Sequence, residues 1–113
     1  MTATIILVGV LTVTSYRPVP EQTKPECRGR FACTTSIDDG ITRYGVAASQ
    51  DLFASGEVKY GDILWIPGYG NRIVNDSMGP KNRRAIDLLV LTKAEEKAVG
   101  VRRLPVYRLG VAK

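Results

Sequence analysis

Short apolar stretches separated by turn-forming residues recur along the chain. The first stretch is rich in Thr, Ile and Val, and it predicts a strand over residues 5–16. Five further stretches predict strands over residues 44–48, 62–67, 71–75, 85–91 and 101–109. Glycines at positions 68 and 70 separate two of these strands and indicate a hairpin turn. The pattern therefore predicts about six short strands.

Two short helices are expected between these strands. Ser49 is a candidate N-cap for a helix over residues 50–55. Thr92 and Glu95 form a Thr-x-x-Glu capping box, which predicts a second helix that ends at Gly100. Short strands, turn signals and two short helices together predict an all-β chain folded as a small closed barrel.

A long loop is expected between the first two strands, from Arg17 to about Arg43. Loops of this length within a small domain are usually functional or mobile. The loop contains Cys27 and Cys33, whose C-x5-C spacing is typical of neither a zinc site nor a thioredoxin motif. A loop-closing disulfide and two free thiols both fit this spacing.

The chain has 113 residues, which predicts a single domain over residues 1–113. Its first stretch is apolar, but no Lys or Arg precedes Arg17 and no cleavage site is evident, so we expect no signal peptide in this chain. The stretch is also too short for a transmembrane helix, and we expect no membrane span. A mature form, a trimmed form and delivery by another route all fit these observations.

Charge and composition narrow the chemistry. The net charge is +5 and the chain has no histidine, which excludes Ser-His-Asp and Cys-His nucleophile systems and removes the commonest zinc ligand. Acid–base chemistry then falls to Asp, Glu, Lys, Tyr or Cys, and we expect no metal and no cofactor. The positive charge fits a solvated surface or attraction to an anionic polymer. No phosphate loop, RNA-binding aromatic signature or helix-turn-helix is present, so we expect no nucleic-acid partner.

Two aspartates are the strongest candidates for chemistry. Asp87 lies within an apolar strand, where a carboxylate either faces solvent or has a designated partner. Partial burial would raise its pKa and let it act as a general acid. Asp76 ends the strand over residues 71–75, and if the two strands are neighbours both carboxylates reach one patch. A solvated Asp87 and a turn-capping Asp76 are the alternatives.

Four segments together resemble a known family. They are Val-Ala-Ala-Ser-Gln-Asp at 46–51, Gly-Asp-Ile-Leu-Trp-Ile-Pro-Gly-Tyr-Gly at 61–70, Asn-Asp-Ser-Met-Gly-Pro at 75–80, and Ala-Ile-Asp-Leu at 85–88. This pattern resembles the three-aspartate (3D) domain over residues 12–109. The resemblance implies a six-stranded double-psi β-barrel related to MltA-type lytic transglycosylases, RlpA-like barrels and expansins.

The resemblance also implies roles for particular residues. Asp87 matches the family aspartate that acts as general acid and base on a glycosidic bond, and Asp76 matches a supporting aspartate. Ser15 and Tyr16 match the groove-lining end of the first strand. The family's first aspartate falls on Ser49, so one of the three aspartates is displaced.

Several other residues are candidates for the same groove. Asp51 lies two positions after the displaced aspartate, and Asp38 or Asp39 in the long loop could supply a third carboxylate. Tyr69 in the Gly-Tyr-Gly turn could stack on a sugar ring, whereas Trp65 is expected in the core. Three basic residues flank the loop between the two aspartates and could steer an anionic polymer, namely Lys81, Arg83 and Arg84.

The function that follows is cleavage of peptidoglycan glycan strands by a lytic transglycosylase-like or glycoside hydrolase mechanism. The alternative is a non-catalytic glycan-binding or structural barrel, such as a phage virion or tail component. The expected partner is a polysaccharide, with assembly into a larger particle in the second case. The expected location is extracytoplasmic or virion-associated.

Overall fold

The computed structural model describes residues 3–17 and 45–111. The expectations for Cys27, Cys33, Asp38 and Asp39 lie outside the described residues. No helix in the described part of the chain is long and apolar enough to cross a bilayer.

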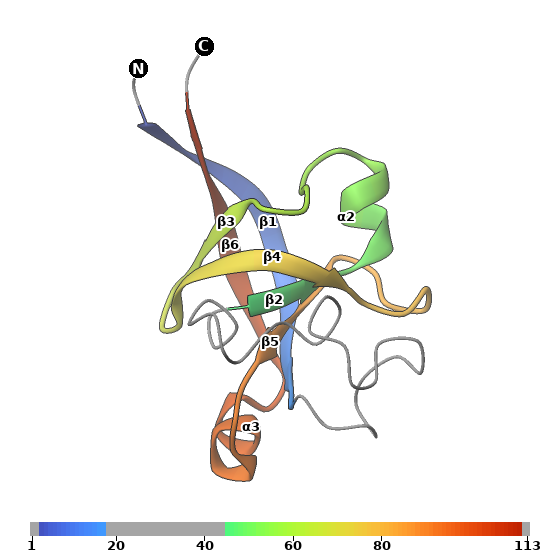
Figure 1. Cartoon of the computed structure of the whole chain (residues 1–113), viewed down its shortest axis with the longest axis vertical. Helices are drawn as coiled ribbons and strands as arrows, with labels where there is room; N and C mark the ends of the chain where they lie inside the picture. Colours follow the sequence, from blue (N-terminus) through green and yellow to red (C-terminus); the bar gives the residue numbers. More distant parts are fainter. Residues whose placement is uncertain (1–2, 18–44, 112–113) are drawn as a thin grey trace.

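Six strands and two short helices make up the described fold (Figure 1). Their bounds are β1 Ala3–Tyr16, β2 Gly45–Ala48, α2 Gln50–Ala54, β3 Ile63–Ile66, β4 Gly70–Ser77, β5 Ala85–Leu89, α3 Lys93–Val99 and β6 Arg102–Val111. The strands close into a barrel in the order β1-β5-β2-β4-β3-β6. The predicted all-β class, with a closed six-stranded barrel and two short helices, is confirmed.

The strand order has an internal symmetry. Strands β1 and β5 run parallel, as do β2 and β4, whereas the other described pairs are antiparallel. Exchanging β1, β2 and β3 with β4, β5 and β6 leaves the ring order unchanged. This exchange also turns one parallel pair into the other. The antiparallel β2–β5 pair lies between the two parallel pairs, in the middle of the wall that carries the candidate site.

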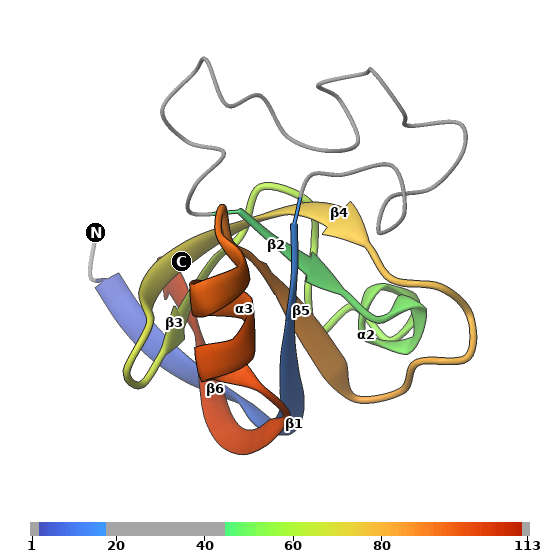
Figure 2. The same ribbon diagram turned by 90° about the horizontal axis from the view of Figure 1, so that it is seen from below.

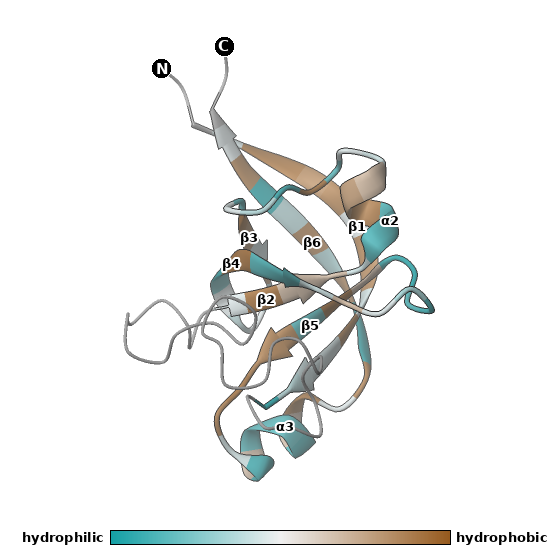
Figure 3. Cartoon of the chain, turned by 45° about the vertical axis from the view of Figure 1, so that its right-hand side comes forward, coloured by the Kyte–Doolittle hydropathy of each residue, from teal (hydrophilic) through white to brown (hydrophobic). Residues whose placement is uncertain are grey.

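Apolar side chains at alternate strand positions fill the interior of the barrel. Leu11 and Val13 of β1, Ile86 and Leu88 of β5, and Val74 of β4 point inward and are fully or almost fully buried. Alternating strand residues face opposite sides of a sheet, so the residues between them face outward. Figure 3 shows the resulting bands of apolar and polar positions along the strands.

The expectation that Trp65 lies in the core is wrong. Leu64 and Ile66 of β3 are fully buried, so the alternation turns Trp65 outward, where 40% of its surface is exposed. Its ring packs against Tyr107 of β6 at a centroid distance of 5.3 Å. Every residue of β3 is apolar, and the sequence therefore did not mark which alternate positions face inward.

The two helices begin where the sequence predicted, but their caps differ. Thr92 accepts a hydrogen bond from the Glu95 N–H, so the predicted N-cap of α3 is confirmed, and the Thr92 hydroxyl in turn donates to the Glu95 carboxylate. Ser49 occupies the N-cap position of α2 without capping it, because its buried hydroxyl accepts the Ala85 N–H instead. Helix α2 is thereby tied to the start of β5 (Figure 2).

Candidate active site on the barrel wall

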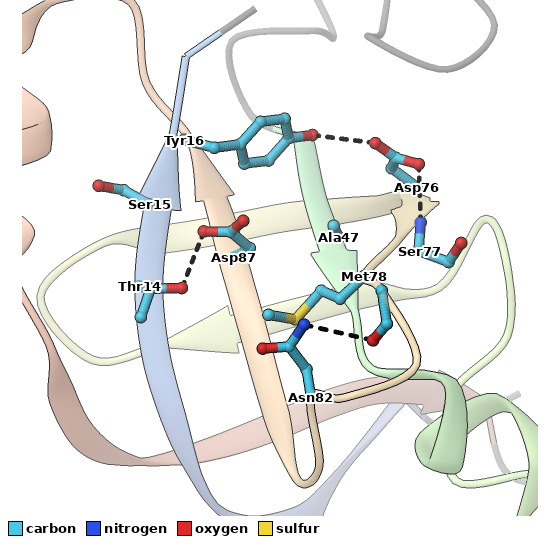
Figure 4. A pocket seen from close by; sticks show the side chains of 10 residues that line it. Thr14, Ser15, Tyr16, Ala47, Asp76, Ser77, Met78, Asn82 and Asp87 are labelled. Carbon is cyan, nitrogen blue, oxygen red and sulfur yellow. Dashed lines mark hydrogen bonds between the residues drawn. The ribbon is translucent and has the colours of Figure 1, made fainter. Parts of the chain in front are cut away.

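A polar row crosses four adjacent strands on the outer face of the barrel. Thr14 of β1 lies beside Asp87 of β5, which lies beside Ala47 of β2, which lies beside Asp76 of β4 (Figure 4). The strands of the two aspartates are therefore not neighbours, because β2 lies between them. Ala47 is small, and it leaves the space between the two carboxylates open.

The strand that carries Asp76 is longer than the sequence predicted. Strand β4 continues through Asp76 to Ser77 because Ala47 and Ala48 of β2 pair with these two residues. Asp76 is thus a strand residue whose side-chain direction is set by strand pairing. The alternative interpretation, in which Asp76 caps a turn, is not what the structure shows.

An apolar border surrounds this row. A second cluster of buried side chains lies on the outer face and comprises Tyr16, Ala47, Met78, Ala85 and Leu89. Together with the polar row, part of this cluster lines a pocket formed by Thr14, Ser15, Tyr16, Ala47, Asp76, Ser77, Met78, Gly79, Asn82 and Asp87. Buried apolar neighbours exclude water from the carboxylates and strengthen the electrostatic interactions between them.

Asp87 has the environment of a general acid. Burial is the main cause that raises its pKa, to about 6, and the negative charges of Asp76 and Glu96 add to this effect. The Thr14 hydroxyl donates a 2.8 Å hydrogen bond to one Asp87 carboxylate oxygen, which opposes the rise. Asp87 can therefore hold a proton in mildly acidic conditions and release it near neutrality.

Asp76 accepts hydrogen bonds from the Tyr16 hydroxyl and the Ser77 N–H among the described residues. The Tyr16 hydroxyl lies 3.4 Å from Asp76 Oδ2, and the Ser77 N–H donates to Asp76 Oδ1 at 2.8 Å. Burial raises the pKa of Tyr16, as do the charges of Asp76 and Asp87, so its hydroxyl stays protonated and can keep donating. This contact fixes the Asp76 carboxylate at the pocket edge.

Ser15 contributes to the pocket lining, but its hydroxyl is committed elsewhere. It lies 3.3 Å from the Glu96 carbonyl oxygen of α3 as donor, and Figure 4 shows it directed away from Asp87. Glu96 also forms an ion pair with Arg17 at 3.2 Å. Glu96 is thus a third carboxylate near the site, and no local pattern marked it, because the packing of α3 at the end of β1 brings it there.

The other candidates lie outside this pocket. Ser49 is fully buried, and its hydroxyl accepts the Ala85 N–H. Tyr69 packs against the barrel core from the β3–β4 turn. Asp51 accepts the Arg84 N–H and lines a neighbouring hollow with Asn82 and Arg83. The two hollows adjoin at Asn82, which lines both.

The Asp51 carboxylate is stabilised in its charged form by its neighbours in the fold. Burial alone would raise its pKa, but hydrogen bonds from Ser49 and from the Arg84 N–H, with the nearby charge of Arg83, lower it overall. Arg84 is also occupied, because it forms an ion pair with Glu57 at 2.7 Å. Lys81 and Arg83 are exposed beside the pocket.

Thr14 is the main residue that the sequence analysis missed. The alternation of buried Leu11 and Val13 with Thr12, Thr14 and Tyr16 was the signal that could have found it.

Among the described residues, no group of three or more acidic, Cys or His side chains is placed to hold a metal ion. Comparison of the sequence with models of known families finds no match, and comparison with curated proteins finds none either.

Proposed function

We propose that this protein cleaves peptidoglycan glycan strands, with Asp87 as the general acid and base. The observation that carries the proposal is Asp87 itself, a carboxyl with a pKa raised to about 6 in a polar pocket on the barrel wall. The pocket supplies a second carboxylate at Asp76 and a neutral hydroxyl donor at Tyr16. The resemblance to the three-aspartate domain supports the assignment of both aspartates.

The reaction uses one carboxyl group twice, first as an acid and then as a base. Protonated Asp87 donates its proton to the glycosidic oxygen as the bond between that oxygen and the sugar C1 breaks. The ionised Asp87 then accepts the proton of the sugar's own 6-hydroxyl while the oxygen of that hydroxyl bonds to C1. The product is an anhydro sugar end, and Asp87 returns to its protonated form.

The separation of the two aspartates fits this chemistry. Asp87 and Asp76 lie two strand spacings apart, so their Cα atoms are separated by about 9.5 Å. Retaining glycosidases hold their two carboxyl groups about 5–5.5 Å apart, whereas inverting ones hold them about 6.5–9.5 Å apart. The strand spacing argues against a retaining pair, and the choice of Asp87 as the single acid and base rests on its raised pKa, with Asp76 and Tyr16 placed to bind the sugar or the developing charge.

Charge supports the choice of glycan. The net charge of +5 favours an anionic polymer, and the exposed Lys81 and Arg83 stand at the side of the pocket. Peptidoglycan carries carboxylates on its peptides, and it lies outside the cytoplasm. An extracytoplasmic or virion-associated location follows from the proposed substrate.

The direct test is digestion of purified peptidoglycan by the wild type, by Asp87→Asn and by Asp51→Asn. Asp51→Asn is the control for loss of a carboxylate outside the pocket, and urea unfolding at the assay pH checks that this variant is still folded. We expect anhydro-muropeptides from the wild type and the control, with a loss of at least about 100-fold for Asp87→Asn. Reducing-end products in mass spectrometry would instead indicate hydrolysis and a second catalytic carboxylate.

A non-catalytic glycan-binding or structural barrel is the second candidate. It is favoured by the described lining of the pocket, where Asp76 and Asp87 are the two aspartates, since Ser49 is buried and Asp51 accepts the Arg84 N–H outside the pocket. This candidate predicts that wild type and Asp87→Asn sediment equally with insoluble cell wall and release no products. That result would exclude the enzymatic proposal.

A further inference from the structure

The first half of β1 has an unpaired outer edge. Residues 12–16 of β1 pair with β5 on one side, whereas residues 3–13 pair with β6 on the other. In the part of the chain that the structure describes, no strand pairs with the second edge of residues 3–7. Figure 1 shows this part of β1 and the end of β6 leaving the barrel together as a two-stranded ribbon. An unpaired edge presents N–H and C=O groups that another extended strand can bind.

The β1 strand of this ribbon exposes large apolar side chains on both faces. Ile5 and Leu7 are 66% and 58% exposed, and Ile6, which alternates with them, is 41% exposed. Exposed edge strands are normally protected by charged side chains or proline. Residues 3–14 contain neither, although the whole chain carries a net charge of +5. Such an uncharged, β-branched edge favours pairing with another strand.

We infer that this edge joins two copies of the chain as a dimer. An antiparallel strand pair centred on Ile5 is self-complementary, because Ile5 meets Ile5 of the second copy and position 3 meets position 7. The same patch is used on both copies, so the contact closes at two. The edge strand itself carries no charge over residues 3–14, and Arg108, which lies opposite Ile6 on β6, is one strand further from the second copy.

The product of this pairing is a four-stranded antiparallel sheet with the order β6-β1-β1-β6. Each added strand pair satisfies backbone groups and covers the exposed isoleucine and leucine side chains. The ribbon lies at the opposite end of the molecule from α3, whereas the candidate site lies near the α3 end of β1. The dimer leaves the pocket open, and the inference does not depend on the proposed function.

Sedimentation over a concentration series tests the inference with wild type, Ile5→Lys and Val101→Lys. Val101 is the matched control, since it is 77% exposed at the start of the β6 segment and away from the ribbon. We expect a reversible monomer–dimer equilibrium for wild type and control. Ile5→Lys places two lysines side by side and should weaken the dimer by more than about tenfold. Circular dichroism confirms that each variant is folded.

A cysteine variant tests the geometry independently. Opposite residues of an antiparallel pair have Cα atoms about 4.5–5.5 Å apart, which is within disulfide range. In a background with Cys27→Ser and Cys33→Ser, Ile5→Cys should form a covalent dimer on mild oxidation, whereas Val101→Cys should not. A monomeric wild type at all concentrations, an unchanged dimer in Ile5→Lys, or assembly that continues beyond two copies would each overturn the inference.

Discussion

At the residue scale, the protonation of Asp87 is set by neighbours from three other elements. Burial by the outer apolar cluster and the charges of Asp76 and Glu96 favour the protonated form. Thr14 alone among these neighbours favours the charged form, through its hydrogen bond to the carboxylate. The balance can therefore be shifted by changing Thr14 without adding or removing a charge.

Thr14→Val is expected to raise the pKa of Asp87 further. The change keeps the side-chain shape and removes a hydrogen bond to the charged carboxylate, so the shift is upward by up to about one pH unit. Carbon NMR of the carboxyl group measures it directly, and the alkaline limit of any glycan cleavage should move in the same direction. Ser15→Ala is the matched control, because the Ser15 hydroxyl donates to the Glu96 carbonyl oxygen and forms no hydrogen bond with Asp87. An unchanged or lowered pKa in Thr14→Val would contradict this account.

At the scale of elements, β1 changes its register within one strand. A bulge between Leu7 and Gly9 separates the ribbon from the barrel wall. Gly9 has a φ of 153°, and a Cβ at this position would meet the Arg84 guanidinium at 2.5 Å. That guanidinium donates to the Val8 carbonyl and pairs with Glu57. The bulge, the start of β5 and the segment after α2 are thus held together around one glycine.

Gly9→Ala should destabilise the fold by about 1–3 kcal/mol. The new methyl group strains the backbone and displaces Arg84 from its contacts with β1. Urea unfolding measures the loss. Gly79→Ala serves as the control, because Gly79 has no positive φ and its nearest neighbour atom would lie at 3.9 Å. Equal stability of the two variants would show that the bulge tolerates a side chain.

At the scale of the whole molecule, the buried Asp87 carboxylate lowers the free energy of unfolding near neutral pH. The pKa of Asp87 rises from an ordinary value of 3.8 to about 6 on folding, so the folded state binds this proton more tightly than the unfolded chain. The contribution of Asp87 to stability is therefore most favourable below about pH 4, and it is lost as the pH rises to about 6. A shift of about two units corresponds to roughly 3 kcal/mol at most.

Asp87→Asn removes this cost because asparagine stays neutral. The variant should match the wild type near pH 4 and exceed its stability at pH 7 by about 1–3 kcal/mol, as measured by urea unfolding across this range. Asp51→Asn should behave oppositely and lose stability at pH 7, since the pKa of Asp51 is lowered by its contacts in the fold. A wild type that is as stable as Asp87→Asn at pH 7 would show that Asp87 is not appreciably destabilised by burial.

Local patterns in the sequence determined the elements of this protein. Strand alternation, glycine turns and the Thr92 capping box depend on neighbouring residues, so the six strands, the hairpin and both helix starts could be predicted. The exceptions have local causes too. The uniformly apolar β3 hid the outward position of Trp65, and the polar neighbours of Asp76 hid the continuation of β4.

Only the tertiary structure decided how the site is assembled. Asp87 and Asp76 could be singled out because carboxylates are unusual in and beside apolar strands, but their relative position depends on β2 lying between β5 and β4. Thr14 is far from Asp87 in the sequence, and the pairing of β1 with β5 brings it there. Glu96 lies on α3, the element that follows β5, and it acts on Asp87 only because α3 packs at the end of β1, while Asp51 and Tyr69 lie outside the pocket. Strand register is a long-range property, and single-sequence patterns do not encode which strands become neighbours.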